Sequence, residues 1–395
     1  MRATIIQRPV GQGGLCEGGL LFDGEAISWL YDCGSDQTSS LEREIEKVAP
    51  TLKLLFISHL HADHVSGIDR LMLHSEVEEV VLPYLNDAAR LLVAAQAIEQ
   101  GRISGLFLEF LEDPAAWLQA RGAQRVTFIG DADDLGDDFP PFTPREPRKP
   151  DAPGSEKSLK AQMAWDVEPE EFAQGIRTAR PGAMLQFVGA KSYVDWCFLP
   201  YAHGPPKKML AEFKAALEIE FPNTTDRAIA AEAKTKSGRD KLEACYAMLW
   251  TDHNLVSMSL YAGPMFADPH IAIDSGGVPN WRGHSRWTEH GSAAGWLATG
   301  DANLQRKGRR NSFLRAYGHF LPRTGVLVVP HHGAANSWHD ALLAGFPGLV
   351  HGIAAAGPNK WGHPHRAVID AFARRGVPFS QVDELRQTQL TIRVP

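Results

Sequence analysis

Cysteine is scarce in this sequence, and long apolar runs are missing from it. The 395 residues include four cysteines, Cys16, Cys33, Cys197 and Cys245, and no two of them form a C-x-x-C pair. This excludes a disulfide scaffold and predicts free thiols in a reducing compartment. No stretch approaches the roughly 20 apolar residues of a membrane span, and the first residues lack the apolar run of a signal peptide. We therefore expect a cytoplasmic protein with no membrane contact.

Basic residues are not in excess either. The chain has 40 Lys and Arg against 47 Asp and Glu, so its net charge is −7 with histidine neutral. A protein coated in basic surface for non-specific nucleic-acid binding is excluded, although a local basic groove is not. A hydrophobic content of 44% and a charged content of 22% are those of an ordinary globular protein. The length fits one large domain with insertions, or two domains.

Short apolar runs alternate with polar loops and helical patterns along the chain. Runs of this kind predict strands at residues 20–22, 26–31, 53–57, 80–82, 186–188, 196–199, 256–261, 295–299, 326–329 and 390–394. Helical patterns occupy residues 40–48, 87–100, 207–245 and 367–375. Strands that end in polar loops, with helices between them, indicate an α/β sandwich.

The densest group of metal-binding side chains directly follows one of these strands. The strand at 53–57 leads into His59-Leu-His61-Ala-Asp63-His64. Imidazole and carboxylate groups suit zinc, iron or manganese. Alternate residues of an extended loop can converge on one metal, and Asp63 and His64 can turn toward a second. The alternative is a chance cluster of surface histidines, but the preceding strand favours a metal site.

His-x-His-x-Asp-His after a strand resembles the signature of the metallo-β-lactamase superfamily. The resemblance implies an αββα sandwich with two divalent metal ions, zinc or manganese, at one sheet edge, and metal-activated water as the nucleophile. Further motifs resemble the branch that contains the hydrolase domain of the competence DNA-uptake channel. They are Val10-Gly-Gln-Gly13, Tyr31-Asp-Cys-Gly34, Thr299-Gly-Asp301-Ala302, Pro330-His-His-Gly333 and Asn359-Lys-Trp-Gly-His-Pro364. In this interpretation residues 1–395 form one domain, with inserted helical segments at about 100–185 and 205–250.

The resemblance also assigns roles to residues outside the first cluster. Asp301 resembles the carboxylate that bridges two metals, although an Asp after a glycine can also merely cap a turn. His331 and His332 offer the last metal ligand, and the sequence does not decide between them. His203 stands where the superfamily places its third histidine, although it can equally be an ordinary loop histidine. The expected catalytic residues are Asp63, His332 and His363.

Two more residues are expected to support the site. Asp32 resembles the aspartate that holds the metal loop from behind. Asn359 belongs to the closing motif, together with His363, and both are expected on the substrate side. For His363 the alternative is a plain turn histidine before Pro364.

A basic run follows Asp301. It comprises Arg306, Lys307, Arg309, Arg310, Arg315 and Arg323, of which the first four are expected to bind substrate, and no acidic residue lies between Ala302 and Arg323. A cluster of one sign beside a metal site is suited to binding phosphates. A solvated helix face explains the run equally well.

The leading functional hypothesis is a phosphodiesterase, a nuclease that acts on single-stranded DNA or RNA. The same metal centre would also serve a small phosphoester of the cyclic-nucleotide or phosphocholine type. A thioester, lactone or β-lactam hydrolase fits the closing motifs less well. In a different class, the chain is a subunit of a defence or signalling complex whose insertions dock a protein partner. The complete ligand set argues against a subunit without catalytic activity.

Overall fold

A computed structural model of the chain describes residues 1–101, 104–135, 139–144, 162–188, 194–249, 256–267, 269–274 and 288–395. In the described part, no helix is both long enough and apolar enough to cross a membrane. The four cysteines are all buried and free.

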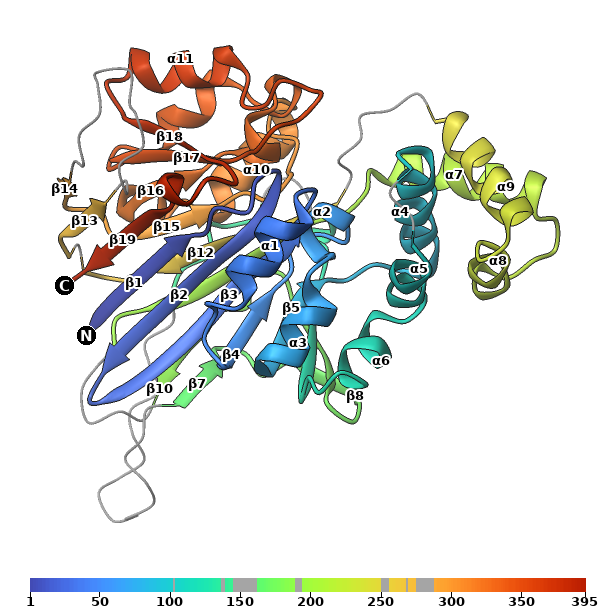
Figure 1. The fold of residues 1–395 in the computed structure, drawn as a ribbon, viewed down its shortest axis with the longest axis horizontal. Coiled ribbons are helices and arrows are strands. Elements are labelled where there is room, and N and C mark those ends of the chain that lie inside the picture. The colour runs from blue at the N-terminus through green and yellow to red at the C-terminus, as the bar shows by residue number, and fades with distance from the viewer. Residues whose placement is uncertain are drawn as a thin grey trace.

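Two β-sheets form the centre of the molecule (Figure 1). The larger has the strand order β14 (Thr288–Gly291), β13 (Ile271–Asp274), β19 (Leu390–Val394), β1 (Arg2–Gln7), β2 (Gly13–Phe22), β3 (Glu25–Ser35), β4 (Thr51–Phe56), β5 (Glu76–Pro83), β6 (Arg125–Ile129), β9 (Ile176–Ala179) and β8 (Glu170–Ala173). The smaller has the order β18 (Phe379–Val382), β17 (His351–Ala355), β16 (Thr324–Val328), β15 (Gly295–Ala298), β12 (Ser257–Gly263), β11 (Cys197–His203), β10 (Leu185–Val188) and β7 (Gln162–Trp165).

The two sheets pack face to face, and helices cover their outer faces. Along β4, Leu54 and Phe56 belong to the core between the sheets, whereas Leu55, which stands between them in the sequence, belongs to a second core shared with helices. This alternation follows from the period of two along a strand. Between the sheets, the Trp29 ring lies 5.4 Å from Phe198 and 5.6 Å from Trp296, centroid to centroid.

The helices are unevenly distributed over the two outer faces. They are α1 (Thr38–Ile45), α2 (Ala62–Val65), α3 (Ile68–His74), α4 (Asp87–Glu99), α5 (Gly105–Glu112), α6 (Pro114–Gln119), α7 (Lys207–Glu220), α8 (Asp226–Glu232), α9 (Lys236–Ala247), α10 (Lys307–Ala316) and α11 (Arg366–Arg374). Helices α1 and α3 to α9 contribute to the core outside the larger sheet, and α10 and α11 to the core outside the smaller one. The four layers are therefore helix, sheet, sheet and helix, which confirms the predicted αββα sandwich.

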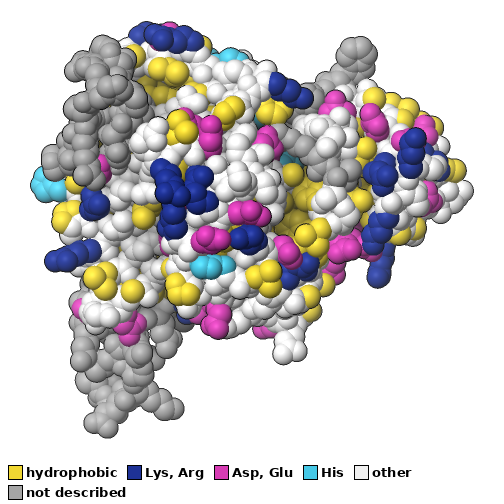
Figure 2. All heavy atoms as spheres, in the orientation of Figure 1, with side chains coloured by type: hydrophobic (Ala, Val, Ile, Leu, Met, Phe, Trp, Pro, Cys, Tyr) yellow, Lys and Arg dark blue, Asp and Glu magenta, His cyan; other side chains and the backbone are white. Residues whose placement is uncertain are grey.

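Helices α4, α5 and α7 to α9 form a lobe beside the sandwich, on the right of Figure 1. Figure 2 shows apolar side chains in the hollow between this lobe and the sandwich. The hollow has a volume of about 670 Å³, and its walls include Leu91, Leu108 and Phe128. Helices α7 to α9 coincide with the predicted helical segment at 207–245. Within the region predicted as an insertion at about 100–185, β6, β9 and β8 continue the larger sheet, whereas residues 102–103, 136–138 and 145–161 lie outside the described residues.

Candidate metal centre

The turn after β4 carries four of the predicted metal ligands. The strand ends at Phe56, and α2 begins one residue after His61. This turn packs so closely on the end of β3 that a Cβ atom at Gly34 would lie 2.5 Å from the backbone of His64. Only glycine fits at such a distance, which gives a physical reason for the glycine in the Asp32-Cys-Gly34 motif.

The remaining ligand candidates follow two neighbouring parallel strands of the other sheet. Asp301 comes after β15, and His331 and His332 come after β16, so all three lie at the same edge. The backbone is left-handed at Gly300 (φ +53°), His331 (φ 49°) and His332 (φ 54°). This conformation is uncommon for residues other than glycine and often marks a functional turn. The two histidines are therefore held in a tight turn beside Asp301.

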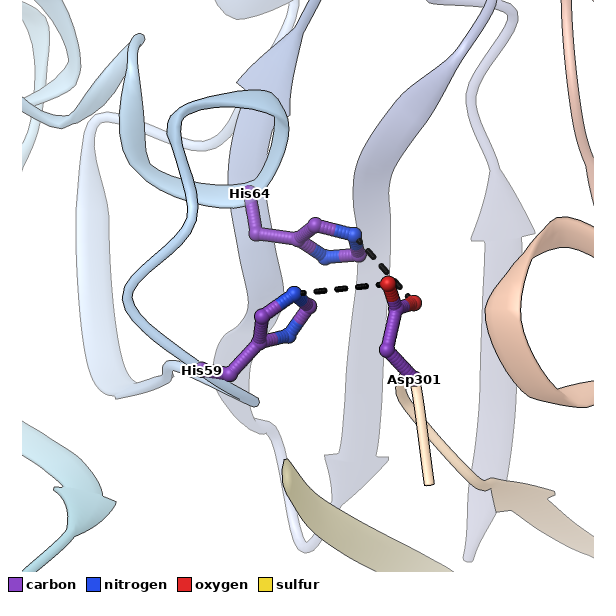
Figure 3. Close-up of side chains that lie close together, drawn as sticks. All are labelled: His59, His64 and Asp301. Atoms are coloured by element: carbon purple, nitrogen blue, oxygen red, sulfur yellow. Dashed lines mark ion pairs between the residues drawn. The ribbon is translucent and has the colours of Figure 1, made fainter. Parts of the chain in front are cut away.

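The two carboxylate oxygens of Asp301 face different pairs of histidines. Oδ2 lies 3.5 Å from Nε2 of His59 and 3.8 Å from Nε2 of His331. Oδ1 lies 3.5 Å from Nε2 of His64 and 3.9 Å from Nε2 of His332. Figure 3 shows His59 and His64 pointing at the carboxylate from the loop on the opposite side. One carboxylate thus stands between two sets of imidazole nitrogens, as a bridging ligand would.

The other members of the turn after β4 complete these two sets. Nε2 of His332 lies 3.5 Å from Oδ2 of Asp63 and 3.4 Å from Nε2 of His64. Asp63, His64 and His332 therefore form one group whose ligand atoms are mutually close, and His59, His61 and Asp63 form another. His332 joins the group around Asp63, whereas His331 faces the other oxygen of Asp301.

These separations fit bound metal ions. Tetrahedral zinc with bonds of 2.0–2.1 Å keeps its ligand atoms roughly 3.3 Å apart, and the separations here are 3.4 to 3.9 Å. Nε2 of His59 is buried and has no hydrogen-bond partner, which is rare for a buried polar atom. A cation at this position would satisfy it. His59, His61 and Asp63 would surround one metal and Asp63, His64 and His332 another, with Asp301 between them through its contacts with His59 and His64.

The histidines are oriented from behind by hydrogen bonds to their second ring nitrogens, as is usual around metals. The pairs are His59 Nδ1 with Ser58 Oγ (2.9 Å), His61 Nε2 with Gln96 Oε1 (3.0 Å), His64 Nδ1 with Asp32 Oδ2 (2.8 Å), His331 Nδ1 with Ser337 Oγ (3.3 Å) and His332 Nδ1 with the Ala355 carbonyl (2.7 Å). Asp32 also accepts hydrogen bonds from the backbone N–H and the hydroxyl of Ser58. Asp32 therefore supports the metal loop and does not enter the ligand set itself.

Burial and charge divide the protonation states of the site. Burial lowers the pKa of His59 well below its ordinary value, and burial also lowers the pKa of His61. For His64, burial acts in the same direction, but the carboxylates of Asp32 and Asp301 outweigh it and raise the pKa to about 10. For Asp301, burial is outweighed by the surrounding histidines, led by His331, which lower its pKa. A neutral imidazole and an ionised carboxylate are the forms that bind metal, so His59, His61 and Asp301 are in the binding form, whereas His64 would have to release a proton as a cation enters.

Sequence reasoning missed Gln96, Ser58 and Ser337. Gln96 lies on α4 and is buried, and its side-chain oxygen accepts the hydrogen bond of His61. The signal in the sequence is a single polar residue in the apolar run Leu91-Leu-Val-Ala-Ala-Gln96. With its side-chain oxygen as the acceptor, Gln96 favours the His61 tautomer that carries its proton on Nε2, which would leave Nδ1 to bind a metal.

Replacing Gln96 with Leu is expected to weaken metal binding by roughly 10- to 100-fold, the usual effect of losing such a supporting contact. Gln96→Glu keeps an acceptor oxygen and is expected to retain most of the affinity. Competition with a chelator measures both variants, with thermal melting to confirm folding. Equal affinity of Gln96→Leu and the wild type would show that Gln96 only fills space.

The other predicted residues lie around this centre. His203 is buried at the end of β11, and within the described residues it belongs to none of the three close ligand groups. The His363 ring lies 5.1 Å from that of His331, and its Nδ1 is buried without a hydrogen-bond partner. Asn359 binds only its own loop: its amide donates to the carbonyls of Gly357 and His363. Asn359 thus shapes the closing motif rather than supporting a metal ligand.

The structure corrects the expectation that the whole basic run faces a substrate. Arg310 is 7% exposed, and its guanidinium donates to the carbonyls of Leu304 and Gln305. Arg309 donates to the carbonyl of Gly204. Only Arg306 and Lys307 of the four are exposed. The start of α10 uses two of its cations to hold neighbouring loops, so the run offers fewer charges to solvent than its composition indicates.

Comparison with known proteins gives a local match. Residues 18–92 match the family described as Anti-Pycsar protein Apyc1, a segment that contains Asp32 and the ligands from His59 to His64. Because the match spans less than half of the chain, it stays a local similarity. A search of curated proteins finds no match.

One solved structure extends over nearly the whole chain. It is the metallo-β-lactamase fold protein YhfI from Bacillus subtilis, with 10% identity and a TM-score of 0.36, covering 97% of this chain and 98% of that one.

Proposed function

We propose that the protein is a metal-dependent hydrolase of phosphodiester bonds. The observation that carries the proposal is the position of Asp301, whose two oxygens face separate sets of histidines at 3.5 to 3.9 Å. Such a carboxylate is suited to holding two cations close together. Paired cations activate water and stabilise both the attacking and the leaving oxygen of an in-line displacement at phosphorus.

Three side chains have defined tasks in this proposal. Asp63 would hold one cation together with His64 and His332 and would supply a fixed negative charge beside the reacting phosphate. His331, 21% exposed, faces the substrate side and is placed to hydrogen-bond a phosphate oxygen. His363 lies beside it with a buried nitrogen that lacks a partner, and this nitrogen is available to the leaving oxygen.

We favour a small phosphodiester of the cyclic-nucleotide type over a nucleic-acid polymer. A polymer groove needs a row of solvent-facing cations along the backbone. Here Arg309 and Arg310 bind protein carbonyls, and the net charge is −7. The expected protein partner for the helical segments stays a prediction, as does the resemblance to the competence branch.

A substrate panel tests the proposal. Purified protein with manganese or zinc is expected to hydrolyse 2′,3′- or 3′,5′-cyclic nucleotides and bis(p-nitrophenyl) phosphate, and to lose this activity when a chelator removes the metal. Single-stranded DNA and RNA are the competing substrates. Hydrolysis of a thioester, lactone or β-lactam without any phosphodiester turnover would contradict the proposal.

The two exposed cations provide a separate test of substrate size. In the Arg306→Ser/Lys307→Ser double variant, turnover of a small phosphodiester is expected to stay unchanged, because no metal ligand is altered. If a single strand is the natural substrate, each lost phosphate contact instead lowers the slope of log affinity against log salt by roughly 0.7. A drop in this slope together with weaker binding of DNA or RNA would favour the polymer.

A further inference from the structure

An open cleft of about 580 Å³ lies next to the closing motif. One wall is formed by Asn359, Lys360 and Trp361, and the other walls by Asp36 at the end of β3 and by Gln100 after α4. The volume lies in the range of roughly 300–1,000 Å³ that is typical of small-molecule sites. Polar and charged side chains predominate, apart from one large aromatic ring.

That ring, Trp361, is 41% exposed, unlike the tryptophans buried between the sheets. It lies nearly parallel to the ring of His363, at 24° and 6.1 Å between centroids. The ammonium group of Lys360 is 5.2 Å from its centroid. An indole backed by another ring and open to solvent on a cleft is a platform on which a flat base can stack.

The loop that carries Trp361 is fixed by Asn359. The side-chain oxygen of Asn359 accepts the backbone N–H groups of Trp361 (3.1 Å) and His363 (3.0 Å). Its amide nitrogen donates to the carbonyls of Gly357 (2.8 Å) and His363 (2.9 Å). All four bonds come from one side chain, so the indole is positioned before any ligand arrives, which lowers the entropic cost of binding.

The platform is connected to the metal centre through neighbouring rings. His363 lies 6.1 Å from Trp361 and 5.1 Å from His331, and Nε2 of His331 lies 3.8 Å from Asp301. A ligand with its phosphate at Asp301 and a flat group on Trp361 would pass along His331 and His363.

We infer that the cleft beside Trp361 is the subsite that binds the base of a nucleotide substrate. The inference rests on the proposed function for the phosphate and for the cyclic-nucleotide class, and it adds the place at which the base binds. Gln37 also lines the cleft, but its side chain already hydrogen-bonds to the backbone: its oxygen accepts from the Gln12 N–H, and its amide donates to the Pro358 carbonyl. Glu99 and Gln100, at the end of α4, also line the cleft and offer carbonyl and carboxylate oxygens to the amino groups of a base.

Calorimetric titration of the metal-loaded protein with AMP and with ribose 5-phosphate tests this inference, because the two ligands differ only in the base. AMP is expected to bind the wild type more tightly. Trp361→Ala is expected to weaken AMP binding by roughly 5- to 100-fold, as for the loss of one base–aromatic stack, with the affinity for ribose 5-phosphate and the metal content unchanged. Trp361→Phe keeps an aromatic face and is expected to restore most of the AMP affinity.

The possible failures can be told apart. Equal binding of AMP and ribose 5-phosphate to the wild type, or unchanged AMP binding by Trp361→Ala, would overturn the base subsite while phosphodiester turnover by the wild type still supports the proposed function. Trp361-dependent AMP binding in a protein that hydrolyses no phosphodiester would overturn the proposed function and retain the subsite.

Discussion

Asp301→Asn is expected to lower kcat/KM for a phosphodiester by at least about two orders of magnitude in a protein that still folds. The substitution keeps the shape of the side chain but removes the negative charge that lies between His59 and His64. Losing one preorganised electrostatic contact in an active site typically costs 10²- to 10³-fold. Two neighbouring cations without the bridging charge would also repel each other more strongly.

Steady-state kinetics, metal analysis and circular dichroism measure this variant. Asp274→Asn is a matched control, because Asp274 lies on β13 and pairs with Arg393, away from the metal centre. The Asp301 backbone N–H donates a hydrogen bond to the Ser257 hydroxyl, and Asp301→Asn leaves this bond intact. Wild-type turnover by Asp301→Asn would mean that Asp301 only caps its turn.

His61→Ala and Asp63→Ala should each abolish binding of one metal ion and reduce activity by more than roughly 100-fold. Supporting contacts around metals already account for 10- to 100-fold effects, and these residues are placed in the ligand set itself. His61 belongs to the group with His59, whereas Asp63 is shared with the group that contains His332. Elemental analysis should therefore find about one metal ion fewer per chain in His61→Ala, and likewise in Asp63→Ala.

The matched controls are His270→Ala, an exposed histidine, and Asp69→Ala, whose carboxylate pairs with Arg121. Both should keep wild-type metal content and activity. Full metal occupancy in His61→Ala and in Asp63→Ala would remove these residues from the ligand set.

Much of the architecture could be predicted from local patterns. The strand at 53–57 was visible because its apolar run leads directly into the histidine cluster, and the structure places β4 at 51–56. The helix at 87–100 corresponds to α4 at 87–99. The strands β8 and β13 were not visible, because each is four residues long and their pairing partners, β9 and β19, are set by the tertiary fold.

The site shows the same division between local and tertiary information. The closeness of His59 to His64 could be predicted from spacing, because these residues follow one another after a strand. The role of Arg310 could not, since its carbonyl partners depend on how the loop before α10 folds. The positions of His331 and His332 likewise depend on two left-handed backbone conformations that no residue pattern encodes.

The candidate metal ligands lie far apart in the sequence, at residues 59–64 and 301–332, and this limits the order in which the site can form. During translation, the turn with His59 to His64 leaves the ribosome long before Asp301 and His332 exist. A nascent chain therefore holds a partial histidine cluster that lacks its bridge, and β15 and β16 must dock before the two sets of donors meet. Complete metal loading would accordingly have to follow the synthesis of Asp301 and His332 and the docking of their strands.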